Sequence, residues 1–109
     1  MTDTAPAREI FHFARPDAWR SAQSEGVYRP EEFSAEGFIH CATEAQIDGV
    51  VARHLRGHGP RVRLRIDAEA LGEDLVYEWS QASEDLYPHV FGALPVSAVR
   101  EAVAFDPDA

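Results

Sequence analysis

Three of the five histidines in this chain are flanked by aliphatic or aromatic side chains: His12, His40 and His89. Imidazole can act as an acid, a base, a metal ligand or a hydrogen-bond donor. A buried imidazole is costly unless both ring nitrogens have partners. We therefore expect the three histidines to share one pocket and to be its catalytic residues. The alternative is that each is a core histidine held by backbone hydrogen bonds.

A metal centre is a further alternative for these histidines, because zinc sites can be built from three imidazoles and a water. A metal-dependent hydrolase would then result. The separations are long and contain no short ligand pair, so we predict no metal ligands. His54 and His58 have helical spacing, but Gly57 and Gly59 indicate that the helix ends there. We expect both to be exposed polar residues.

Residues around the second histidine have simpler predicted roles. Cys41 would face away from His40, because adjacent strand residues point to opposite faces, and we expect it to be buried. Thr43 and Gln46 form a capping-box pattern at a helix start. Free N–H groups at such a start, with the Thr43 hydroxyl, can hold a phosphate.

Several other side chains are candidates for ligand contact. Arg63 lies in an alternating arginine row that is either a solvated strand face or a phosphate-binding wall. Glu78 could stabilise a cationic transition state or be a surface carboxylate. Tyr28 and Arg29 lie in a segment expected to cover the site as a loop, and Phe91 follows the third histidine. The tryptophans and Tyr77 are expected in the core.

Composition excludes several functional classes. The net charge of −9 and the pI of about 4.8 argue against general binding to nucleic acid or anionic membrane. All ten basic residues are arginines, so no lysine is present for a Schiff base. A single cysteine permits no internal disulfide. With no apolar signal segment and no run near ~18 apolar residues, we expect a cytoplasmic location.

The predicted organisation is one globular domain over 9–105, with tails at 1–8 and 106–109. Apolar periodicity and Gly/Pro punctuation predict helices over 16–25 and 44–56, both in the N-terminal half. The segments read as strands are 9–14, 38–41, 61–67, 75–79 and 99–105, with 86–94 as an aromatic segment. Because helices and strands do not alternate regularly, we expect an α+β fold with small mixed or antiparallel sheets.

Three motifs carry a family resemblance. Residues 10–12 read Ile-Phe-His, residues 37–43 read Gly-Phe-Ile-His-Cys-Ala-Thr, and residues 87–95 read Tyr-Pro-His-Val-Phe-Gly-Ala-Leu-Pro. With these motifs the chain resembles, from about residue 10 to 105, a small bacterial family named domain of unknown function 952. That family is similar in fold to the ADP-ribosyltransferase superfamily, which includes the RNA 2′-phosphotransferases.

The resemblance implies a ligand and roles for the histidines. The superfamily binds NAD, as a substrate, or an ADP-ribosylated intermediate in a cleft between two small sheets. By resemblance His12 contacts the ribose or nicotinamide side, His40 takes the second strand position, and His89 lies at the far wall. The superfamily's transferases also carry a glutamate that stabilises the oxocarbenium-like ribose, and Glu78 is the nearest residue in type.

The resulting expectation is a nucleotide-binding cleft for NAD, ADP-ribose or a related ligand, with ADP-ribosyl transfer or hydrolysis as its chemistry. The expected ligand-binding residues are Thr43, Tyr28, Arg29, Phe91 and Arg63. A non-catalytic ligand-binding or protein-binding module of the same fold is the first alternative. The metal-dependent hydrolase on three histidines is the second. No partner protein is indicated.

Overall fold

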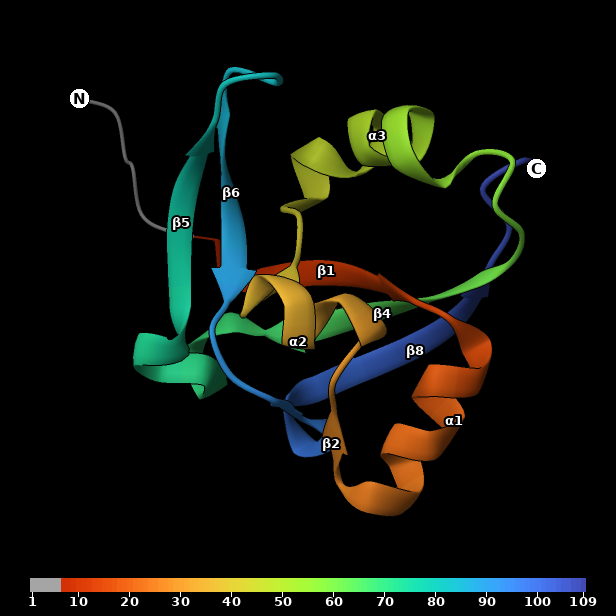
Figure 1. The fold of residues 1–109 in the computed structure, drawn as a ribbon, viewed down its shortest axis with the longest axis vertical. Coiled ribbons are helices and arrows are strands. Elements are labelled where there is room, and N and C mark those ends of the chain that lie inside the picture. The colour runs from red at the N-terminus through yellow and green to blue at the C-terminus, as the bar shows by residue number, and fades with distance from the viewer. Residues whose placement is uncertain (1–6) are drawn as a thin grey trace.

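The computed structural model describes residues 7–109, which fold into small antiparallel sheets and short helices (Figure 1). The strands group as β1-β4-β8, β3-β6-β5 and the two-stranded β2-β7. Every strand pair is antiparallel, so the predicted α+β class with antiparallel sheets is confirmed at this level. No helix among residues 7–109 is long and apolar enough to cross a membrane.

The main helices and strands have the following bounds. The helices are α1 (Pro16–Glu25), α2 (Glu31–Glu36) and α3 (Ile47–Val50). The strands are β1 (Glu9–Ala14), β2 (Val27–Tyr28), β3 (Ile39–His40), β4 (Arg61–Asp67), β5 (Leu75–Ser80), β6 (Asp85–Val90), β7 (Leu94–Pro95) and β8 (Val99–Phe105). Further helical turns occupy Glu44–Gln46, Val51–Leu55, Ala68–Asp74 and Val96–Ala98.

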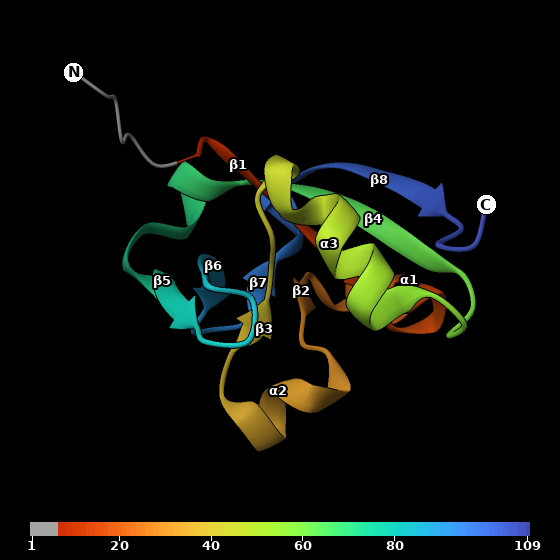
Figure 2. The same ribbon diagram turned by 90° about the horizontal axis from the view of Figure 1, so that it is seen from above.

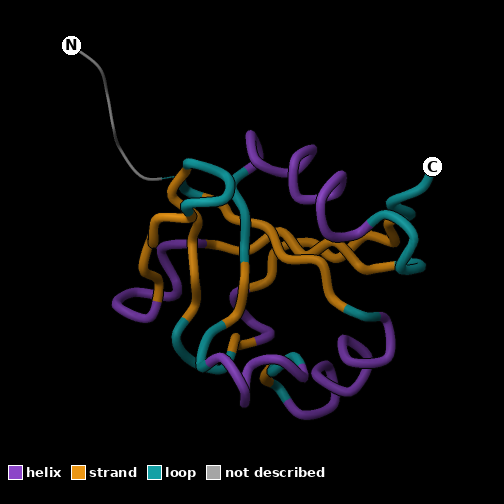
Figure 3. Tube along the Cα trace, turned by 45° about the horizontal axis from the view of Figure 1, so that its top comes forward, coloured by secondary structure: helices purple, strands orange, loops and turns teal. Residues whose placement is uncertain are grey.

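The sheet β1-β4-β8 runs through the middle of the molecule, with α3 on one side and α1 on the other (Figures 1 and 3). Strict alternation in β4 directs Leu64 and Ile66 into the core, where both are fully buried. Ile10 and Ala14 of β1 are equally buried and lie on the same side of the sheet. The three strands predicted over 9–14, 61–67 and 99–105 have these bounds in the structure.

The sheet β3-β6-β5 presents the histidines. Ile39 pairs with Val90 and His40 pairs with His89 across β3 and β6. The two aliphatic side chains are buried on the core side, so alternation places both imidazoles on the opposite face. Outside the named strands, Phe11 and Ala42 exchange backbone hydrogen bonds of 2.7 and 2.8 Å. This bridge brings β1 and its histidine next to the segment that follows β3.

The segment 27–36 is not the predicted loop. Its first residues pair as β2 with β7, and the rest forms α2, a third helix in the N-terminal half. Six residues give fewer than two turns, so no apolar repeat marked this helix. The Phe33 side chain of this helix packs against the core cluster. The helix ends at Gly37, whose positive φ of 85° favours glycine.

The second predicted helix has the expected length but not a uniform geometry. It begins as a tight turn over Glu44–Gln46, continues as α3, and widens to a π-helical turn over Val51–Leu55. Gly49, Val50 and Val51 are weak helix formers, which is consistent with an irregular helix. Seen from above, this helix crosses over β4 (Figure 2).

Two further expectations concern the core and the chain ends. Trp19 is buried, but Trp79 is 61% exposed near the tip of the β5–β6 hairpin, so its assignment to the core is wrong. Residues 1–6 of the predicted N-terminal tail lie outside the described residues. At the other end, the Asp108 carboxylate accepts hydrogen bonds from the Gly57 N–H at 3.1 and 3.3 Å.

Candidate functional site

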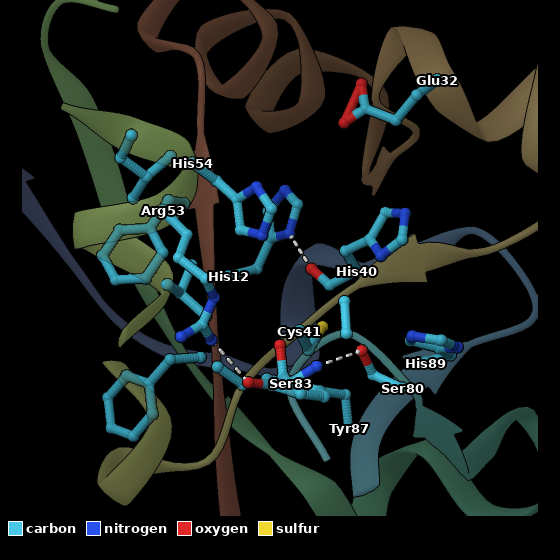
Figure 4. Close-up of a pocket in the computed structure, with 16 residues that line it drawn as sticks. His12, Glu32, His40, Cys41, Arg53, His54, Ser80, Ser83, Tyr87 and His89 are labelled. Carbon is cyan, nitrogen blue, oxygen red and sulfur yellow. Dashed lines mark hydrogen bonds between the residues drawn. The ribbon is translucent and has the colours of Figure 1, made fainter. Parts of the chain in front are cut away.

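A cleft of about 540 Å³ lies between the two larger sheets, the helical segment 44–55 and the β5–β6 hairpin (Figure 4). Its walls are largely apolar and include Phe11, Phe13, Val50 and Leu55. The polar lining residues are His12, Glu32, His40, Arg53, His54, Ser80, Ser83, Tyr87 and His89. The three histidines expected to meet therefore line one cleft, from strands β1, β3 and β6.

His12 is fully engaged by the protein itself. Its Nδ1–H donates to the His40 carbonyl at 2.6 Å, and its Nε2 accepts from the Tyr28 hydroxyl at 2.8 Å. The side chain is 6% exposed, and this burial lowers the pKa of His12, although the bond to the carbonyl opposes the shift. The imidazole is therefore neutral and has no nitrogen left for a ligand. It matches the core-histidine alternative.

Tyr28 lies behind His12 rather than in the cleft lining. It is 2% exposed, and its ring meets the imidazole edge-on with centroids 5.2 Å apart. Burial raises the pKa of Tyr28, so the hydroxyl remains protonated and can donate to Nε2. In this structure the Tyr28 hydroxyl, which was expected to contact a ligand, contacts Nε2 of His12.

His40 has one ring nitrogen held by a carboxylate. Its Nε2 lies 2.7 Å from Oε1 of Glu36, the last residue of α2. The two side chains are about half exposed, at 54% and 46%. Among residues 7–109, the Nδ1 of His40 has no hydrogen-bond partner. This imidazole is therefore oriented by the protein and still able to exchange a proton.

His89 has the same arrangement with the opposite ring nitrogen. Its Nδ1 lies 2.7 Å from Oε1 of Glu78 on the adjacent strand β5, and its side chain is 15% exposed. Its Nε2 has no partner within the described part of the chain. Glu78 does not line the cleft and contacts His89 instead, and its catalytic role stays a prediction.

The two carboxylate-bound imidazoles lie next to each other. The ring centroids of His40 and His89 are 5.2 Å apart, and the rings are nearly perpendicular at 81°. Phe38 stacks on His89 with centroids 4.2 Å apart and also meets the ring of His40 edge-on at 4.8 Å. Strand pairing and this aromatic contact together hold the pair in one geometry.

The other predicted ligand contacts lie outside the cleft lining. The Thr43 N–H donates to the side chain of Gln46 at 3.0 Å, the capping arrangement expected from the sequence. Phe91 is 40% exposed and packs against the aromatic ring beside His89. The guanidinium carbon of Arg63 lies 5.9 Å from the centre of the Phe11 ring, and Arg29 is exposed.

Sequence reasoning missed Glu32, Glu36, Arg53 and Tyr87. Glu36 precedes His40 by four residues, a spacing that could have suggested the pair. Glu32 enters the cleft wall only because α2 forms. Arg53 donates to the Tyr87 hydroxyl at 2.7 Å across 34 residues of sequence, a contact without a local signal.

The residues present do not form a three-histidine metal centre. Among residues 7–109, no group of three or more histidine, cysteine or acidic side chains has an arrangement that could hold a metal ion. His12 would have to lose its bond to Tyr28 or to the His40 carbonyl to become a ligand. The geometry therefore gives the metal-dependent alternative no support.

Comparisons with known proteins give a family and a fold. No curated protein matches the chain. The X-ray structure of protein CC0527 from Caulobacter crescentus is 31% identical, with a TM-score of 0.83, over 90% of this chain and 86% of that chain. The X-ray structure of a CC0527 double mutant is 30% identical, with a TM-score of 0.82, over 90% of this chain and 86% of that chain. The solution NMR structure of CC0527 is 31% identical, with a TM-score of 0.78, over 92% and 86%.

None of these matches is described as an ADP-ribosyltransferase, so that likeness stays a prediction. The family model described as protein of unknown function (DUF952) matches residues 13–102, most of the chain. The motifs around His40 and His89 lie within this range, and the histidines they carry line the cleft. The chain therefore belongs to the DUF952 family.

Proposed function

We propose that the cleft binds a nucleotide of the NAD and ADP-ribose class. The observation that carries this proposal is the convergence of His40 and His89 on one apolar-walled cleft, each with a ring nitrogen unbonded within residues 7–109. Oriented imidazole nitrogens suit the hydroxyl and phosphate groups of a nucleotide. The resemblance to the ADP-ribosyltransferase superfamily points to the same ligand class.

The size and charge of the cleft support this proposal. Its volume of about 540 Å³ lies within the range of roughly 300–1,000 Å³ common for small-molecule sites. Arg53, on the segment 44–55, brings a cationic guanidinium to the cleft lining in a chain of net charge −9. The Arg53 guanidinium gives one donor to Tyr87 and has others for a phosphate.

ADP-ribosyl transfer or hydrolysis, the chemistry that the resemblance implies, needs a carboxylate near the ribose. Glu78 is bound to His89 and lies outside the cleft lining. Glu32 is the acidic residue among the described lining residues, so this chemistry would depend on Glu32. The variant Glu32→Gln should then lose transfer while it retains nucleotide affinity.

The direct test is an NMR titration of isotope-labelled protein with NAD and with ADP-ribose. We expect saturable shifts at His40, His89 and Arg53. The variant His40→Ala should lose binding with its melting temperature nearly unchanged, and His58→Ala, an exposed histidine outside the cleft lining, is the matched control. An absence of shifts at millimolar ligand would contradict the proposal.

A non-catalytic binding module is a second candidate, and one observation favours it. His12, to which the resemblance gives ligand contact, has both ring nitrogens engaged within the protein. Saturable nucleotide binding without turnover of NAD would select this candidate over a transferase.

A further inference from the structure

The reaction that the family resemblance implies has a task for at most one proton-transfer group, a base for the acceptor, whereas the cleft has two carboxylate–histidine pairs. When nicotinamide leaves NAD, the electron pair of the bond between ribose and nicotinamide goes to the cationic nicotinamide ring. Nicotinamide therefore departs as a neutral molecule and needs no proton. Each imidazole is nevertheless oriented by a carboxylate, Glu36 on His40 and Glu78 on His89. The second of these groups, an acid, therefore needs another explanation.

The bonding pattern gives each imidazole one nitrogen for proton transfer. The carboxylates contact Nε2 of His40 and Nδ1 of His89, so Nδ1 of the first and Nε2 of the second are unbonded within the described residues. A neutral imidazole accepts a proton at such a nitrogen, and an imidazolium donates one from it. With centroids 5.2 Å apart, both rings can address one small reacting group.

The backbone beneath this pair is held from several sides. The imidazole of His12 donates to the carbonyl of His40, and the strand register fixes His40 opposite His89. Functional groups on regular elements with such support keep a narrow geometry. His12 therefore acts as a positioning residue, while the two oriented imidazoles are exposed to the cleft.

We propose that His40 and His89 form a general acid–base couple that cleaves a phosphate ester of a nucleotide, an inference that rests on the proposed nucleotide ligand. One histidine of the couple, with its imidazole neutral, acts as the base and takes a proton from water as the water oxygen bonds to phosphorus. The phosphorus–oxygen bond to the ribose breaks, and the other histidine, as an imidazolium, acts as the acid and gives its proton to the departing oxygen. Exchange with solvent restores both rings.

Phosphate-ester chemistry explains why two histidines are present. A ribose oxygen is a poor leaving group without a proton, so the reaction needs an acid as well as a base. The donors that Arg53 does not use for Tyr87 are suited to the phosphate oxygens. The loss of nicotinamide, by contrast, has no leaving oxygen that needs a proton.

The test uses the full chain with adenosine 2′,3′-cyclic monophosphate, followed by ³¹P NMR and chromatography of the adenosine monophosphate product. We expect turnover by the unaltered protein. Each of His40→Asn and His89→Asn should slow it by at least about 100-fold, the usual contribution of a proton-transfer group. His58→Asn, prepared in the same way, should match the unaltered protein.

The outcomes separate this inference from the proposed function. Saturable nucleotide binding without product would overturn the acid–base couple and leave the proposed ligand class in place. No binding of the cyclic nucleotide, NAD or ADP-ribose would overturn both. Turnover unchanged in both variants would overturn the assignment to these histidines. His40 is more than half exposed, so His40→Asn should fold and carries the test if His89→Asn does not.

Discussion

His12 and the pair of His40 and His89 line the same cleft but differ in how many of their ring nitrogens the protein binds. The first is 6% exposed and bonded at both ring nitrogens, to Tyr28 and to a carbonyl. The other two are each bonded at one nitrogen, to a carboxylate. Apolar neighbours in the sequence are common to all three. The role of each imidazole therefore depends on its partners across the fold, and the first serves structure while the other two are available to a ligand.

The largest expected difference between the buried histidine and the other two is in the free energy of unfolding. His12→Ala removes a buried ring, leaves a cavity and orphans the Tyr28 hydroxyl and the His40 carbonyl. We expect a loss of about 3 kcal/mol in chemical denaturation. His40→Ala should cost less than about 1 kcal/mol, since exposed pairs contribute little. Equal losses in the two variants would contradict the separation of roles.

A smaller effect is expected behind the buried histidine. Tyr28→Phe keeps the ring but removes the hydroxyl that donates to His12 Nε2. The buried nitrogen is then unsatisfied, so we expect a loss of about 1–2 kcal/mol in the same denaturation experiment. Tyr87→Phe, at a partly exposed hydroxyl of the cleft, is a matched control and should change stability less.

The same comparison predicts a pH dependence of folding. Burial lowers the pKa of His12 below 6.5, so this group binds a proton more readily in the unfolded chain. Its contribution is present in full above pH 6.5 and is lost as the pH falls toward the folded-state pKa. The loss is at most about 1.4 kcal/mol per pH unit.

Two neighbouring side chains also act on the pKa of His12: the Glu32 carboxylate raises it, and the His40 imidazole lowers it. Unfolding free energies of the unaltered protein and of His12→Asn should therefore be measured at a series of pH values. The difference between them should shrink below pH 6.5. A constant difference would show that the buried imidazole does not remain neutral.

The smallest expected effect tests the oriented pair directly. Glu36→Gln should change the unfolding free energy by less than about 1 kcal/mol. It should, however, change the hydrogen bonding of the His40 ring, measured from the ¹⁵N shifts of its two nitrogens. The shifts of His89, whose partner is Glu78, should change less. A response equal in both rings would contradict independent carboxylate pairing.

Local patterns predicted much of the fold. Helix α1 begins at Pro16 and ends before Gly26, and β4 alternates over its whole length, so their bounds follow from the sequence. Helix α2 was missed because one and a half turns contain no repeat. Trp79 was assigned to the core by residue type, but β5 is an edge strand of its sheet and its aromatic side chain faces solvent.

The candidate site was predictable in its histidines and not in their bonding. Apolar neighbours singled out His12, His40 and His89, and the cleft contains all three. Which nitrogens are engaged depends on contacts such as Tyr28 to His12, which joins two separate elements and has no sequence pattern. Glu32 and Arg53 likewise come to the cleft through tertiary packing.

The bridge between Phe11 and Ala42 has a mechanical consequence. Within residues 7–109, it is the isolated β-bridge that links β1 to the chain just after β3. The hydrogen bond from His12 to the His40 carbonyl joins the same two sheets, and their buried side chains share one core cluster, so the sheets are held together beside the cleft. The position of His12 relative to the other two histidines is therefore set by contacts between the sheets, whereas the spacing of the His40 and His89 rings is set within one sheet.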